Sequence, residues 1–196
     1  MTAAVLYGVG AGALHAVTGP DHLLSLGPIA IRTSRAWQVG LRWGLGHAVG
    51  TLLLAIPLLV TAHAFDLSEL AVLGERLAGA ALLFMAASSA WHLGRAHEAT
   101  TPSADTNRTF TVGFVHGVSG GASLLLALPM VLGGSVTTSA AYLVAFAVGS
   151  TIAMAFLTAG LAKWGMRLSS KTQHRLQWSL VAMSAGLGVF WLASAG

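Results

Sequence analysis

Four residues of types that bind metal ions lie in two apolar segments near the N-terminus: His15, Asp21 and His22 in the first, and His47 in the second. At a rise of about 1.5 Å per helical residue, His15 lies about 18 Å and His47 about 17 Å into its segment. Both depths are near the middle of a hydrocarbon core about 30 Å thick. Ionisable residues there are costly and are functional candidates by default. Imidazole nitrogen and carboxylate oxygen suit divalent first-row metals, so the sequence predicts a metal site.

The Gly19-Pro20 pair interrupts the first of these segments. Pro20 cannot donate a hydrogen bond to the carbonyl of Ala16, which would leave an oxygen for an ion or a water. The break can also bring His15 close to Asp21. Two structural alternatives remain open. Asp21 can simply stabilise the first turn of a helix capped by Thr18 or Gly19, and a histidine at this depth can bridge two helices by a hydrogen bond.

A second copy of the His15 region occurs 101 residues later, and it adds His116 as a fifth candidate ligand. The two stretches read HAVTGPDHLLSLGPIA and HGVSGGASLLLALPMV. The second copy has Ala122-Ser123 in place of Asp21-His22, and Gly120-Gly121 in place of the Gly-Pro break. The sequence therefore predicts an internal repeat, of which the second half lacks the carboxylate. The alternative is two similar apolar helices that match by composition.

The composition is that of a membrane protein. Of the 196 residues 55% are hydrophobic and only 8% are charged, against about 25% charged in ordinary soluble domains. This excludes a soluble enzyme and a disordered chain, and the absence of Cys excludes a disulfide scaffold. We expect an all-α polytopic membrane protein with six transmembrane helices, over residues 3–31, 36–62, 69–94, 110–132, 136–162 and 175–195.

The polar stretch 95–109 divides a single transporter domain, residues 1–196, into repeat 1 (1–94) and repeat 2 (110–196). Each repeat has three spans, so the second copy must enter the membrane from the opposite side. The prediction is a 3+3 inverted repeat with interrupted helices 1 and 4, a construction typical of secondary transporters.

Basic residues occur only in the odd-numbered loops and at the adjoining span ends, apart from Arg42 and Arg76. The loop residues are Arg32, Arg35, Arg95, Arg108, Lys163, Arg167, Lys171 and Arg175. By the positive-inside rule both termini should lie outside the cytoplasm, in a multi-pass protein of the inner cell membrane. The net charge of +4 is explained by these loops, so we expect the lipid bilayer as partner and no nucleic acid.

The pattern His15…Asp21-His22, followed by Gly46-His47 and by His116-Gly117, resembles nickel/cobalt transporters. It is most similar to the NicO- and UreH-like branch of the LysE-like superfamily. The resemblance implies transport of Ni²⁺ or Co²⁺, with these histidines and Asp21 at the metal-recognition positions. The spacing departs from the family, in which four residues separate the first His from the Asp-His pair. Here five residues intervene.

Together these features predict a secondary transporter for a divalent transition metal, Ni²⁺ first and Co²⁺ second. No GxxxxGK[ST] motif and no HExxH motif occurs, so we expect neither ATP-driven transport nor an enzyme. The metal ion is the substrate, and no prosthetic group is expected. The alternatives are a non-transporting membrane accessory or metal-delivery protein, and a LysE-like exporter of another substrate.

Overall fold

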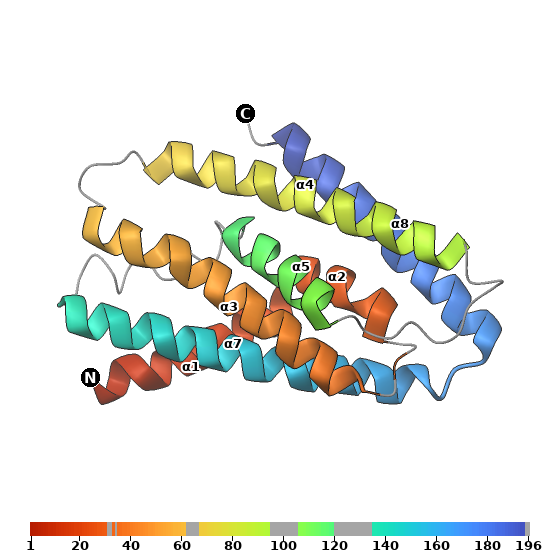
Figure 1. Cartoon of the computed structure of the whole chain (residues 1–196), viewed down its shortest axis with the longest axis horizontal. Coiled ribbons are helices and arrows are strands. Elements are labelled where there is room, and N and C mark those ends of the chain that lie inside the picture. The colour runs from red at the N-terminus through yellow and green to blue at the C-terminus, as the bar shows by residue number, and fades with distance from the viewer. Residues whose placement is uncertain (31–32, 34, 62–66, 95–105, 120–134, 195–196) are drawn as a thin grey trace.

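The computed structural model describes residues 1–30, 33, 35–61, 67–94, 106–119 and 135–194, and these contain helices and no strand. Figure 1 shows the helices side by side in one elongated bundle. They are α1 (Thr2–Thr18), α2 (Pro20–Ala30), α3 (Ala36–Thr61), α4 (Leu67–Gly94), α5 (Thr106–Ser119), α7 (Val136–Gly165) and α8 (Ser170–Ser194).

The first predicted span is interrupted at the predicted place. Helix α1 ends at Thr18. The backbone of its C-cap residue, Gly19, is extended (φ −68°, ψ 109°), while the Gly19 N–H still donates to the His15 carbonyl at 2.9 Å. Helix α2 begins at Pro20, where a missing N–H costs nothing. The two axes meet at 62°. Thr18 does not cap α2, because its hydroxyl donates to the Leu14 carbonyl of its own helix.

Glycines make the closest contacts between helices. In membranes such small residues let two backbones approach, because no side chain separates them. A Cβ added to any of these glycines would run into the backbone of the facing helix. They are Gly8 and Gly12 of α1 against α7, Gly40 and Gly44 of α3 against α7, Gly46 and Gly50 of α3 against α5, Gly113 and Gly117 of α5 against α3, and Gly79 and Gly188 between α4 and α8.

The same contacts define the helix directions. The facing pairs are Gly8 with Tyr142 and Gly12 with Phe146, Gly113 with Trp43 and Gly117 with His47, and Gly40 with Met154 and Gly44 with Thr151. Helix α1 is therefore parallel to α7, α3 is parallel to α5, and α3 is antiparallel to α7. It follows that α1 and α5, the first helices of the two predicted repeats, run in opposite directions (Figure 1).

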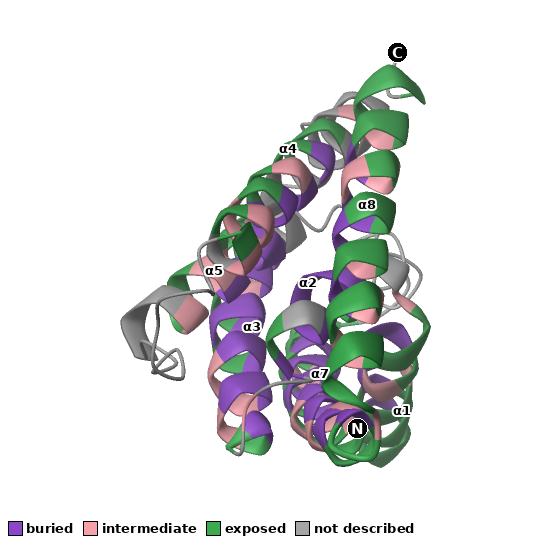
Figure 2. Cartoon of the chain, turned by 90° about the vertical axis from the view of Figure 1, so that its right-hand side faces the viewer, coloured by how far each residue is buried: buried purple, intermediate pink, exposed green. Residues whose placement is uncertain are grey.

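The outward faces of the helices are exposed (Figure 2), and many of the exposed side chains are large and apolar. Large side chains such as Phe156 (74% exposed) and Phe84 (64% exposed) point away from the core. A soluble monomer rarely exposes so many apolar groups together, so this surface suits lipid. Three helical segments are long and apolar enough to cross a membrane: Ala36–Pro57, Val136–Gly165 and Ser170–Ser194. The bent pair α1–α2 brings the number to four if it forms one span.

The six-span inverted repeat thus stays a prediction. Among the described residues, α4 and α5 contribute only the shorter apolar stretches Leu82–Trp91 and Thr109–Val118. Helix α5 ends at Ser119, so the predicted second interruption at Gly120-Gly121 lies outside the described residues. Two helices begin before their predicted spans. Helix α5 begins at Thr106 and its apolar stretch at Thr109, against a predicted span from 110, and α8 begins at Ser170, against a predicted span from 175.

Two glycines of α1, Gly10 and Gly12, test the helix packing, because only Gly12 faces another helix. Gly12→Ala should lower the free energy of unfolding by about 1–3 kcal/mol, because its Cβ would meet the backbone of Phe146 and Ser150. Gly10→Ala has nothing within 4 Å, and should be neutral or stabilising by up to about 1 kcal/mol. The measurement is reversible unfolding in mixed detergent. Equal effects of the two substitutions would contradict the packing.

Candidate metal site

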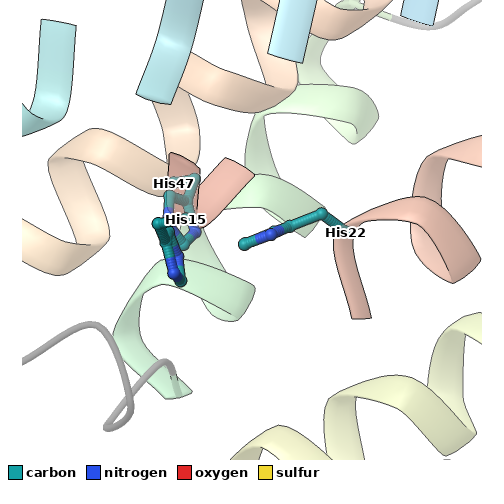
Figure 3. Close-up of side chains that lie close together, drawn as sticks. All are labelled: His15, His22 and His47. Carbon is teal, nitrogen blue, oxygen red and sulfur yellow. The ribbon is translucent and has the colours of Figure 1, made fainter. Parts of the chain in front are cut away.

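The structure brings all five predicted ligands into one cluster, although they come from four helices. His15 lies in the last turn of α1, and Asp21 and His22 lie in the first turn of α2. His47 is in the middle of α3, and His116 is in the last turn of α5. Figure 3 shows the rings of His15, His22 and His47 pointing toward one another. The break at Gly19 turns α2 so that His22 faces back toward His15.

Three histidines form the first part of the cluster. The ring centroids of His15 and His22 are 4.5 Å apart, those of His22 and His47 are 5.1 Å apart, and those of His15 and His47 are 5.8 Å apart. One ring nitrogen from each lies within 4.8 Å of the other two. Zn²⁺ and similar ions bind imidazole nitrogen at about 2.0–2.1 Å. A small closure of the three rings would therefore place their nitrogens on one ion.

The carboxylate and the remaining histidine form the second part. Nε2 of His116 and Oδ2 of Asp21 are 2.8 Å apart, so the imidazole N–H donates to the carboxylate. Nδ1 of His22 lies 3.8 Å from Oδ1 of Asp21. Asp21, His22 and His116 offer three donor atoms within 4.8 Å of one another. This contact joins α2 to α5, and hence the first half of the chain to the second.

The cluster is buried, and two of its members lack the partners that buried polar groups require. His22, His47 and His116 are at most 1% exposed, and Asp21 is 13% exposed. Within the described part of the chain, neither ring nitrogen of His22 or His47 makes a hydrogen bond. Leaving such groups unsatisfied costs free energy, and each case in a folded protein needs an explanation. A bound cation would supply the missing interactions.

Glycines beside the ligands let the helices bring them together. Gly46 precedes His47 in α3, and Gly117 follows His116 in α5. The Gly117 backbone lies against the His47 carbonyl, where even a methyl group would not fit. A Cβ on Gly19 would likewise meet the side chains of Asp21 and His22. The residues that allow close packing are thus sequence neighbours of the residues that form the site.

Trp43 is part of the site and was not predicted. It is 1% exposed. Its ring is stacked on His47 (centroids 5.4 Å apart, 7° between planes) and also lies 5.1 Å from the His116 ring and 5.6 Å from the His22 ring. The spacing of Trp43 and His47, four residues on one helix, could have shown that they share a face. The indole therefore fixes the planes of the histidines from one side.

The other histidines do not join the cluster where the structure describes them. His174 is exposed at the start of α8 and accepts a hydrogen bond from the Trp178 indole at 3.1 Å. His63 and His97, and the side chain of His92, lie outside the described residues. His174 therefore serves as a histidine control that is remote from the site.

No family model and no solved structure matches the chain. Two curated proteins of Arabidopsis thaliana are similar to it. Chloroplast protein FOR GROWTH AND FERTILITY 2 is 30% identical over 200 residues, which are 91% of this chain and 54% of the relative. Chloroplast protein FOR GROWTH AND FERTILITY 1 is 31% identical over 210 residues, 91% of this chain and 56% of the relative. The chain thus spans about half the length of these relatives.

The resemblance to nickel/cobalt transporters was wrong, because the curated proteins that match along the chain are these chloroplast proteins. The assignment depended on a few residues. Five residues separate His15 from the Asp21-His22 pair, whereas four separate them in that family. Short metal-ligand patterns recur in unrelated proteins, since imidazole and carboxylate bind the same ions wherever a fold brings them together. The geometry of the cluster does not depend on that assignment.

The contact between Asp21 and His116 should be energetically coupled in the metal-free protein. Asp21→Asn and His116→Ala each remove a charge-assisted hydrogen bond that joins α2 to α5, and each should cost about 1.5–3 kcal/mol. The double variant should cost less than the sum, with a coupling of about 1–2 kcal/mol, the upper end for membrane proteins. Detergent unfolding of the four proteins in a chelator measures the coupling. Strict additivity would contradict the contact.

Proposed function

We propose that the cluster binds a divalent transition-metal cation and that the chain carries this cation across a membrane. The observation that carries the proposal is the pair of buried histidines, His22 and His47, whose ring nitrogens have no hydrogen-bond partner among the described residues. The other members of the cluster are two further histidines, His15 and His116, and one carboxylate, Asp21. Four imidazoles and one carboxylate suit ions of the Ni²⁺, Co²⁺ and Zn²⁺ type better than Mg²⁺ or Ca²⁺, and Ni²⁺ and Co²⁺ are the first to test.

The arrangement of the helices supports transport rather than storage. In the predicted repeats α1 corresponds to α5, and α3 corresponds to α7. The pair α1–α7 therefore corresponds to the pair α5–α3, and the two helices of each pair are parallel and packed through glycines. Helix α3 is antiparallel to α7, and α4 is antiparallel to α8, as shown by the contact of Gly79 with Gly188 and by the bond from Ser184 to the Leu82 carbonyl. These relations are the ones expected of an inverted repeat with a site at its interface.

The energy for such transport would come from an ion gradient or the membrane potential. The chain contains no nucleotide-binding motif. Moving one charge through 100 mV is worth about 2.3 kcal/mol, so a divalent cation would gain about 4.6 kcal/mol. The names of the two relatives refer to chloroplasts, growth and fertility, and to no substrate. The proposal therefore depends on the cluster and not on the relatives.

We also propose that the basic end of the bundle faces the cytoplasm. The start of α3, the end of α7 and the start of α8 lie at one end (Figure 1). Arg35 directly precedes α3, Arg167 follows α7, and Lys171 is in the first turn of α8. The N-terminus lies at the other end. Positively charged residues favour the cytoplasmic side.

The absence of cysteine from the chain makes this orientation simple to test. Lys171→Cys should resist an impermeant maleimide added to intact cells, whereas Thr2→Cys at the opposite end should be labelled. Both should react after the membrane is permeabilised, which controls for access. Labelling of the Lys171 variant alone in intact cells would mean that the orientation is reversed.

Asp21→Asn tests the proposed function directly. It keeps the shape of the carboxyl group and removes the charge that offsets the cation, so flux of radioactive Ni²⁺ into proteoliposomes should fall more than tenfold. His174→Ala, a histidine outside the cluster, should leave flux within twofold. Melting in detergent must show that both variants fold. Normal flux in Asp21→Asn would contradict the proposal and leave Asp21 as a helix-start residue of α2.

Binding has a separate optical signal. The Trp43 ring lies within 6 Å of three cluster histidines by ring centroids, so paramagnetic Ni²⁺ or Co²⁺ in the site should quench its fluorescence. Trp43→Phe should abolish most of the metal-dependent quenching, while Trp164→Phe, at the end of α7, should retain it. Saturable quenching in wild type that persists unchanged in Trp43→Phe would place the ion elsewhere.

A further inference from the structure

The five ligands fall into two overlapping sets of three rather than one set of five. The first set is His15, His22 and His47, and the second is Asp21, His22 and His116. Within each set the donor atoms lie within 4.8 Å of one another. Two donors on the same ion are at most about 4.4 Å apart, twice a usual metal–ligand distance. Each set therefore needs only a small closure to hold an ion, and His22 belongs to both.

We propose that the cluster contains two alternative positions for a single cation, and that the cation passes from one to the other while His22 stays bound. This inference depends on the proposed function, and it adds the path of the ion within the site. We name the set with His15 and His47 the inner position and the set with Asp21 and His116 the outer position, although each has two buried members and one half-buried member. The donor-atom distances separate the two sets, which share His22 alone, and Trp43 contacts His47 of the one set and His116 of the other.

The two positions differ in charge. The inner position has three imidazoles and no carboxylate, so an ion there keeps its full double charge in a buried environment. The outer position has Asp21, whose carboxylate offsets one charge. We expect the outer position to bind more tightly and to fill first. Two divalent cations at once would repel each other strongly at this separation, with only one carboxylate between them.

The two positions also differ in the helices that build them. The inner position uses α1, α2 and α3, which all belong to the first half of the chain. The outer position joins α2 to α5 of the second half through the bond between Asp21 and His116. The outer set is therefore complete only while α2 stays against α5, whereas the inner set does not depend on that contact.

Co²⁺ is the probe that distinguishes the positions, because its visible spectrum reports the number and type of its ligands. The purified full chain in detergent should bind one equivalent. His47→Ala removes only an inner ligand, so the Co²⁺ spectrum should stay that of wild type and the affinity should fall less than tenfold, while flux in proteoliposomes falls more than tenfold. His116→Gln removes only an outer ligand, so Co²⁺ should bind more than tenfold more weakly, with a shifted spectrum.

His22→Ala removes the shared ligand and should reduce affinity more than either of the other variants. His174→Ala is the matched control and should behave as wild type. The side chain introduced by His116→Gln can still donate a hydrogen bond to Asp21, which preserves the link between α2 and α5. Melting curves check that each variant folds.

Equal losses of affinity and equal spectral changes in His47→Ala and His116→Gln would show one five-ligand site. They would overturn the two positions while leaving the proposed function intact. Two bound equivalents in wild type would also overturn them. No binding and no flux in wild type would instead refute the proposed function.

Discussion

The close contact between α3 and α5 is the constraint on which the site depends. Gly46 and Gly50 of α3 lie against the α5 backbone at Phe110 and Phe114. Gly113 and Gly117 of α5 lie against the α3 backbone at Trp43 and His47. In lipid, where apolar side chains gain little by leaving their surroundings, such contact through small residues is a main source of helix association. It places His47 and His116 on facing helices at a separation that one indole, Trp43, can span. Larger residues at these glycines would separate the ligands.

A second constraint is the interruption between α1 and α2. A continuous helix would carry Asp21 and His22 further along its axis, away from His15. The extended conformation at Gly19 and the start of a new helix at Pro20 turn the chain so that residues of both helices face one another. The position of Asp21 satisfies two interpretations at once. It lies in the first turn of α2, where the helix dipole favours a negative charge, and it accepts the hydrogen bond from His116.

The sequence predicted the helical class, the break at Gly19-Pro20 and the five residues that come together, because each depends on local chemistry. Proline and glycine specify where a helix stops, and a histidine or carboxylate in an apolar segment needs a partner. The contact of Trp43 with the histidines is not specified by the residue type, since tryptophan also occurs at membrane interfaces. The division of the ligands into two sets depends on side-chain distances across four helices, which no spacing in the sequence contains. The family assignment failed because it depended on a motif of a few residues.

The aromatic face of the site has a consequence for hydration. Trp43 contacts three of the histidines, and its indole nitrogen has no hydrogen-bond partner among the described residues. An ion held by those histidines would meet carbon rather than water on that side, so it would have to give up most of its hydration shell to enter. Mg²⁺ releases its water molecules reluctantly and favours oxygen ligands, whereas first-row transition metals recover the loss through imidazole nitrogen. The site would then select against Mg²⁺ through the cost of dehydration. Trp43 would impose that cost although it does not bind the metal.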